Sequence, residues 1–192
     1  MSEAAVPVRV AKPNGWWGMA IFVASESTLF GCLFGTYFYL RFQTLHWPPP
    51  GTPEPKVVVP LVLAGCLAAT SLPMQLAWWA ARAARVRTAW TLILVSFLVQ
   101  CGYFAFEMHD FLGTLKDFQP TDHAYGSIYY TLLGADHTHV FVGILLNLFL
   151  LLRLLGGLTN YRLVGVRSVV FYWHAVNLIT LLVVGCVLSA SI

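Results

Sequence analysis

The amino-acid sequence predicts an all-α integral membrane protein with five transmembrane helices. Of its 192 residues, 58% are hydrophobic and only 10% are charged, and its mean hydropathy of +0.73 lies far above that of an ordinary soluble domain. The apolar residues gather in five runs of about 20 residues or more, the length that a helix needs to cross the hydrocarbon core. We therefore expect a single membrane domain over residues 1–192.

The first helix ends at "RFQTLHWPPPGTPEPK", because each proline lacks a backbone donor and disfavours helix in the residue before it. The second helix contains Pro73 and is expected to kink there, with Thr70 and Ser71 bonding the carbonyl groups that the proline leaves free. The segments "RAARVR", "LGTLKDFQPTD" and "LLGGLTNYRLVGVR" separate the remaining helices. The predicted helices cover about 16–40, 57–81, 88–111, 124–153 and 168–192.

Positive charges predict the orientation of these helices. In a five-helix topology most of the basic residues fall on one side, and loops rich in lysine and arginine stay in the cytoplasm. That side carries Arg9, Lys12, Arg82, Arg85, Arg87, Arg153, Arg162 and Arg167, and the other carries Arg41, Lys56 and Lys116 with Glu54, Asp110, Asp117 and Asp122. We expect the N-terminus inside and the C-terminus outside. The net charge of +3 is therefore a topology signal, and no nucleic-acid partner is expected.

Glu26 lies in the middle of the first helix, where a charged group is costly and needs a partner. It is either a proton carrier or gate, or a neutral carboxylic acid bonded to a backbone carbonyl or a hydroxyl group of a neighbouring helix. Beside it, Ser27, Gly31 and Gly35 recur at four-residue spacing. Such a stripe of small residues lets the backbone of another helix approach closely, and we interpret it as a helix-packing surface.

Three more polar clusters interrupt the apolar runs, and inter-helix hydrogen bonding is the expected role of each. Asp136 and His139 share one helix face, so we expect the aspartate to accept a hydrogen bond from the imidazole. A metal site is an alternative, but it needs either an unwound turn or Glu107 and His174 from other helices, because His137 and His139 do not converge on one helix face. Clamping of a haem between His139 and His174 is a second alternative. The clusters are Gln100, Tyr103 and Glu107; Asp136, His137 and His139; and His174, Asn177 and Thr180.

Four segments in this order resemble subunit III of haem-copper oxygen reductases, the cytochrome c oxidase subunit III family. They are "ASES" in the first helix, "YFYLRFQ" and "WPPP" after it, "YGSIYYTLLGADHTHVFVGI" in the fourth and "FYWHAVN" in the fifth. The similarity covers nearly the whole chain.

The resemblance implies the short, five-helix bacterial form, a V-shaped bundle with a lipid-filled cleft in the cytoplasmic membrane. It implies a subunit with no redox centre of its own and with bound phospholipids, whose partner catalytic subunit I holds haem and copper. The implied role of the chain is to sustain proton uptake and to protect subunit I from inactivation during turnover. Glu26 corresponds to the family's intramembrane glutamate, which is associated with that cleft and reacts with hydrophobic carbodiimides. Glu107, His139 and His174 also match family positions.

Three positions depart from the family pattern: Asp136 replaces a histidine, Asn177 an aspartate and Thr180 a tryptophan. We hypothesise that the aspartate has moved from the fifth helix, at Asn177, to the fourth, at Asp136, and that this preserves a contact between a carboxylate and a histidine with the partners exchanged. The departures leave the branch open among a cytochrome c oxidase, a quinol oxidase and an accessory protein of nitric oxide reductase. An autonomous haem- or metal-binding membrane protein is the competing class.

Overall fold

A computed structural model describes residues 14–53 and 55–191, and all regular secondary structure in that part is helical. Five segments in it are long and apolar enough to cross a membrane. This confirms the prediction of an all-α, multi-pass membrane protein. The helices are α1 (Asn14–Phe42), α2 (Val58–Ala69), α3 (Ser71–Arg82), α4 (Val86–Thr114), α5 (Ala124–Leu155) and α6 (Asn160–Leu188), followed by a short 3-10 turn, η1 (Ser189–Ser191).

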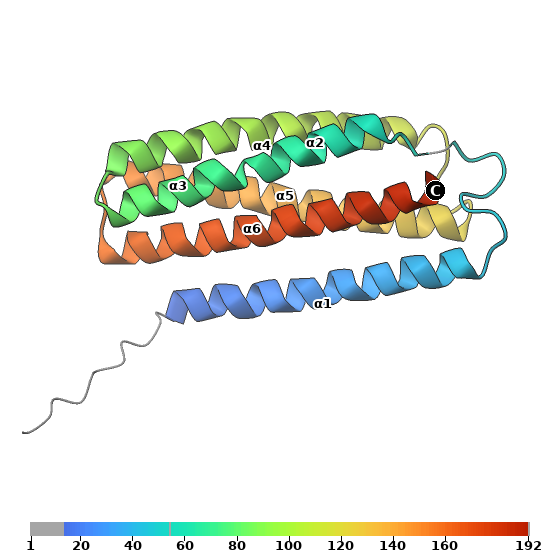
Figure 1. Cartoon of the computed structure of the whole chain (residues 1–192), viewed down its shortest axis with the longest axis horizontal. Coiled ribbons are helices and arrows are strands. Elements are labelled where there is room, and N and C mark those ends of the chain that lie inside the picture. Colours follow the sequence, from blue (N-terminus) through green and yellow to red (C-terminus); the bar gives the residue numbers. More distant parts are fainter. Residues whose placement is uncertain (1–13, 54, 192) are drawn as a thin grey trace, which may run out of the picture.

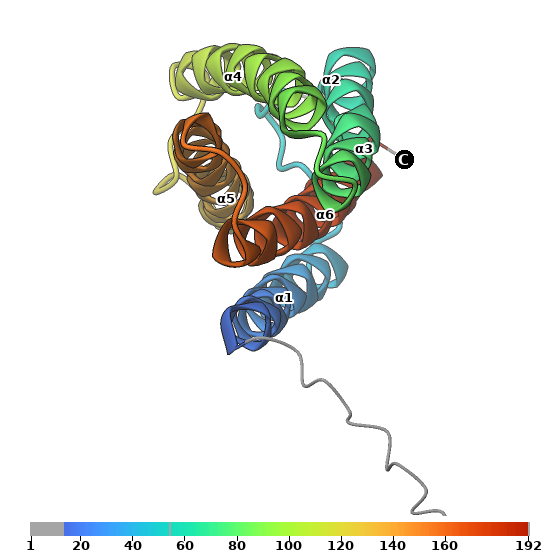
Figure 2. The ribbon, with the colours of Figure 1, turned by 90° about the vertical axis from the view of Figure 1, so that its left-hand side faces the viewer.

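Four of the five spans form a ring, and α1 lies outside it. The second span, α2 with α3, packs against α4 and α6, and α5 closes the ring between α4 and α6. Figure 2, a view along the bundle, shows this ring with α1 alongside α6. The contacts of α1 with other described helices are with α5 and α6. The helix contacts give the ring and the position of α1. The V shape with a lipid-filled cleft stays a prediction.

The second span is divided at Thr70, three residues before Pro73. The hydroxyl of Thr70 donates to the carbonyl oxygen of Leu67 at 2.5 Å and accepts a hydrogen bond from the indole N–H of Trp173 at 2.7 Å. Both Thr70 and Trp173 are buried. The irregular point in the span is therefore tied to the centre of α6 by a side-chain hydrogen bond.

The last helix begins at Asn160, eight residues before the expected start at 168. The hydroxyl of Thr159 caps it by accepting from the N–H of Arg162 at 3.2 Å. The guanidinium of Arg162 in turn donates to the carbonyl oxygens of Gly156 and Gly157, which satisfies acceptors at the end of α5. Since the polar residues here serve as caps, the connection shrinks to residues 156–159. The other helix ends lie within four residues of their expected positions.

The two ends of the bundle differ in charge. One end holds the start of α1 and the α3–α4 and α5–α6 connections (Figure 1), and we name it the basic end for Arg82, Arg85, Arg87, Arg153, Arg162 and Arg167. The other holds residues 43–53 and 55–57 and the α4–α5 connection, and we name it the proline end. Arg9, Lys12 and Glu54, which entered the orientation argument, lie outside the described residues.

Candidate functional site

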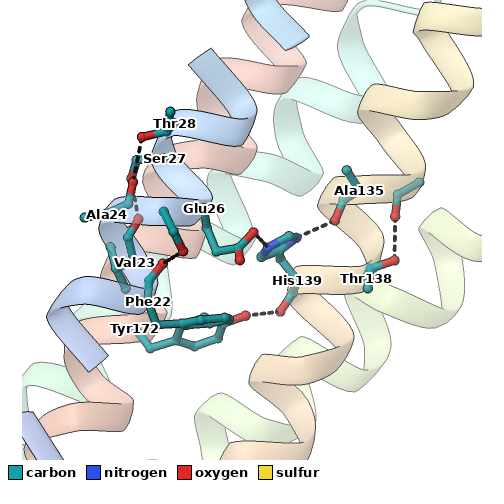
Figure 3. A network of polar contacts seen from close by, with 12 residues as sticks. Phe22, Val23, Ala24, Glu26, Ser27, Thr28, Ala135, Thr138, His139 and Tyr172 are labelled. Carbon is teal, nitrogen blue, oxygen red and sulfur yellow. Dashed lines mark hydrogen bonds and ion pairs between the residues drawn. The ribbon is translucent and has the colours of Figure 1, made fainter. Parts of the chain in front are cut away.

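Glu26 of α1 and His139 of α5 face each other across the interface of these two helices. The carboxylate Oε2 of Glu26 lies 2.9 Å from Nε2 of His139, and the side chains are 22% and 13% exposed. Figure 3 shows the glutamate pointing from α1 to the imidazole. Because α1 lies on the outside of the ring, this partly exposed pair is near the outer surface of the bundle.

The geometry around His139 determines how many protons the pair holds. Its Nδ1 lies 2.7 Å from the carbonyl oxygen of Ala135, an acceptor, so Nδ1 carries a hydrogen. The contact between Nε2 and Glu26 then needs one proton, either on the glutamic acid with a neutral imidazole or on the imidazole with a carboxylate. Both states are neutral overall, and moving the proton between them requires no rearrangement of the helices.

Neighbouring groups hold this pair in place. The ring of Phe30 meets the imidazole edge-on, with centroids 5.1 Å apart, and Tyr172 of α6 donates its hydroxyl to the carbonyl oxygen of His139 at 3.0 Å. The hydroxyls of Ser25, Ser27 and Thr28 bond to carbonyl oxygens of their own helix. Among the described side chains, His139 is the one that hydrogen bonds to Glu26.

The expected hydrogen bond from His139 to Asp136 is wrong, because both ring nitrogens of His139 have other partners. Asp136 instead accepts from the hydroxyl of Thr180 in α6 at 2.8 Å. Asp136 and Thr180 are two of the three positions at which the resemblance implied a departure, so these two residues meet in one contact.

The polar stripe of α6 reaches two different helices. Asn177 donates to the hydroxyl oxygen of Ser71 at 2.6 Å, and His174 lies 3.1 Å from the amide oxygen of Gln75, both in α3. Thr180 reaches α5 instead. Asp136 contacts α6, whereas Asn177 contacts α3. That the aspartate moved from the fifth span to the fourth with its partners exchanged stays a hypothesis.

Two further contacts join α4 to α5. Gln100 accepts a hydrogen bond from the amide of Asn147 at 3.0 Å, and both residues are fully buried. Glu107 faces His137, with 3.9 Å between Oε2 and Nε2, which is too long for a direct hydrogen bond.

Metal and haem ligation were alternatives from the sequence. Within residues 14–53 and 55–191, no three histidine, cysteine, aspartate or glutamate side chains converge as a metal site requires. His139 turns to α1, whereas His174 turns to α3, so the two histidines do not face a common slot.

Several partners were not singled out from the sequence. Gln75 carries the only available signal, a polar side chain inside an apolar run, and Tyr172 carries none, since tyrosine is common near membrane interfaces. Ser71 was expected to bond to carbonyl groups near Pro73, and its contact with Asn177 was not expected. The capping role of His123, whose Nδ1 accepts from the N–H of Gly126 at 2.8 Å, was also missed.

Fold and site together define a helical, multi-pass membrane protein whose intramembrane acids are held by histidine and hydroxyl partners. The chain belongs to the cytochrome c oxidase subunit III family, whose model matches residues 9–188 and confirms the resemblance. A cytochrome c oxidase subunit 3 of Thermostichus vulcanus is 29% identical over 164 residues, covering 84% of this chain and 80% of the relative. A probable subunit 3 of Nocardia farcinica is 28% identical, covering 84% and 81%, and one of Pisaster ochraceus is 28% identical, covering 89% and 68%.

Proposed function

We propose that this chain is the non-catalytic subunit III of a haem-copper terminal oxidase. Membership of the cytochrome c oxidase subunit III family is the observation that carries this proposal. In it, the chain holds no redox centre, and the haem and copper that reduce oxygen lie in the catalytic subunit I. The role of this chain is to stabilise that subunit and to support its proton uptake.

Glu26 and His139 are the residues that we assign to proton handling. They hold one proton between them in either of two neutral states, so the pair relays a proton without net charge in lipid when uptake of one proton accompanies release of the other. Its partial exposure on the outside of the ring supports contact with phospholipids or with the neighbouring subunit.

The remaining polar residues have a structural role in this proposal. Asp136, His174 and Asn177 lie between helices of the ring, where hydrogen bonds stabilise packing that the hydrophobic effect does not drive in a bilayer, and Glu107 lies between α4 and α5, 3.9 Å from His137. They keep α5 and α6 in the positions that present His139 to α1.

We place the protein in the bacterial cytoplasmic membrane, with the basic end in the cytoplasm. The arginine clusters at that end support this orientation, because basic loops are retained inside. The N-terminus is then cytoplasmic and the C-terminus periplasmic. Bound phospholipids are expected at the lipid-facing surfaces of the complex.

The Glu26→Gln variant tests the function. It keeps a hydrogen-bonding group of the same size but carries no exchangeable acid, so the complex should assemble and start at a normal rate but lose activity sooner during turnover. The measurement is oxygen consumption over time, with proton uptake, in the purified complex. Ser25→Ala, next along the helix, is the control, because its hydroxyl bonds only to its own backbone.

Identification of co-purifying subunits tests the assignment to an oxidase. Recovery of a haem- and copper-containing subunit after gentle extraction supports it. Haem or metal bound stoichiometrically to the isolated chain, or a nitric oxide reductase as the partner, would overturn it. An unchanged turnover lifetime in Glu26→Gln would remove this residue from the mechanism.

A further inference from the structure

A second polar site lies inside the ring, away from Glu26. A cavity of about 100 Å³ extends from Lys56 at the proline end to Asp136 and His137 near the middle of α5. A water molecule needs roughly 10 to 15 Å³ of such space, so the cavity has room for several. Its walls carry three tyrosines and several carboxylates, which supply the polar partners that ordered water requires.

His137 has an unused ring nitrogen in this cavity. Its Nδ1 lies 2.5 Å from the carbonyl oxygen of Leu133 and therefore carries a hydrogen, which leaves Nε2 as an acceptor when the ring is neutral. Among the described residues Nε2 has no hydrogen-bond partner, although the side chain is only 5% exposed. The nearest acid is Glu107, whose Oε2 is 3.9 Å away, a separation at which one water molecule can contact both atoms.

The carboxylates around Glu107 and His137 have no positive charge beside them to neutralise them unless protons are bound. Glu107 and Asp136 are both in the inner part of the cavity, and no described lysine or arginine lies beside them. Lys56, at the mouth, is paired with Asp110 at 2.7 Å. Two carboxylates beside a neutral imidazole would place uncompensated charge in the membrane, which is costly.

The other groups facing the pair add no positive charge. From α4 they are Tyr103 and Asp110, from α5 Tyr125 and Tyr129, and from the connecting segment Asp117. The walls from α2 and α6 are apolar, with Pro60, Val184, Val187 and Leu188. The inner cavity is therefore an acidic environment with one available base, His137.

We propose that Glu107, His137 and a bridging water form a proton-binding site that is filled from the proline end. In the deprotonated state the water donates one hydrogen to Nε2 and one to the carboxylate of Glu107. An added proton resides on Glu107, and the water reorients so that it accepts from the carboxyl group and donates to Nε2 of His137. Asp136 is the second carboxyl of the unit and sets how readily the proton is lost.

Infrared spectroscopy of the full-length protein in lipid vesicles tests the site. Glu107→Gln should remove one protonated-carboxyl band that shifts on transfer to D2O, because the cavity admits water. His137→Gln and Asp136→Asn should move the pH midpoint of that band by about one unit or more, since each changes a group that shares the proton. Glu26→Gln is the control and should leave this band unchanged.

Three results would overturn the proposal. The first is a Glu107→Gln spectrum that keeps every protonated-carboxyl band of the wild type. The second is a Glu107 band that does not shift in D2O, and the third is a pH midpoint of that band that is the same with and without His137. Circular dichroism and thermal unfolding establish that each variant is folded, and Glu107→Asp, which retains the acid, should restore an exchangeable band. The outcome is independent of turnover, so it is separate from the test of Glu26.

Discussion

Glu26 carries a carboxyl group at a depth where a charged side chain costs about 2.5 to 3.5 kcal/mol on insertion scales. His139 offsets this cost because the two side chains together are neutral whichever of them holds the shared proton. Neither residue alone has this property. A lone glutamic acid must stay protonated in lipid, and a lone imidazole must stay neutral.

A double-mutant cycle measures this coupling. Glu26→Gln and His139→Gln should each lower the free energy of unfolding by about 1 to 3 kcal/mol, because each disturbs a partly buried charge-assisted hydrogen bond. The double variant should lose less than the sum, since two amides can bond to each other. Unfolding in mixed detergent micelles gives the three values. Strict additivity would mean that the 2.9 Å contact contributes nothing.

For single residues, the sequence predicts which polar side chains lie inside apolar helices but not which of them contact each other. Glu26 and His139 both stand out as polar groups in apolar runs, yet 113 positions separate them. Spacing along one helix reveals only neighbours three or four residues apart, and this is why Asp136 was expected to bind His139. Asp136 is bonded to Thr180 instead, a partner that only the packing of α5 on α6 reveals.

The number and bounds of the helices were predicted more accurately than the contacts between residues, because length and hydropathy are properties of a single segment. The errors lie where polar residues serve as caps. The segment 160–167 contains Asn160, Arg162 and Arg167 and is typical of a loop, but it forms the first two turns of α6. Its side chains cap the helix ends and meet the membrane surface, where charge is tolerated.

Gly143 allows the close approach of α5 and α6. A Cβ atom there would lie 2.5 Å from the ring of Trp173, which is fully buried and anchored by its hydrogen bond to Thr70. Gly143→Ala should therefore destabilise the protein by about 1 to 3 kcal/mol, the usual cost of overpacking. Thermal unfolding in detergent checks this.

Gly134→Ala is the matched control for this substitution. It lies in the same helix, but an added Cβ would have no neighbour within 4 Å, so the variant should be neutral or slightly more stable. Equal stability of the two alanine variants would show that α5 and α6 are less closely packed than described.

Lys56 and Asp110 join the segment before α2 to the end of α4 at the membrane surface. The hydrogen bond to Asp110 raises the pKa of Lys56, with the charges of Asp110 and Asp117 adding to the effect. A raised folded-state pKa gives stability that is present below the unfolded value of about 10.4 and is lost as the pH rises through the folded value. The Lys56 side chain is 67% exposed, so the gain is small.

Lys56→Ala should accordingly cost no more than about 1 kcal/mol at neutral pH. The difference from wild type should shrink in high salt, because salt screens exposed charges, and should vanish at strongly alkaline pH. Denaturation curves at several pH values check this, with Lys116→Ala as the control. A difference that persists in alkali would assign the effect to packing.

In the molecule as a whole, α1 is the helix that the rest of the described chain buries least. Only 6% of the most apolar stretch of α1 is buried, against 56% for α6. Hydropathy could not predict this, since both helices are apolar enough to span a membrane and lipid or protein can cover either. The peripheral position of α1 depends on which faces pack best, and that follows from the side-chain contacts between helices.

The stripe of Ser27, Gly31 and Gly35 makes the uncovered side of α1 suitable for another helix. All three residues are exposed, and a side chain added at Gly31 or Gly35 would meet no other part of the described chain within 4 Å. Within an oxidase, we expect a helix of another subunit to pack here. Gly31→Leu should then leave the unfolding of the isolated chain unchanged but reduce the yield of intact complex, because leucine would hold the partner helix away.

Gly102→Leu in α4 is the matched control, since this glycine is also exposed and has open space around it. Co-purification of the other subunits, quantified by native electrophoresis, compares the two variants. If complex recovery falls for Gly31→Leu alone, the open side of α1 is an interface between subunits. If both variants assemble like wild type, lipid covers α1, and the catalytic subunit contacts the ring helices.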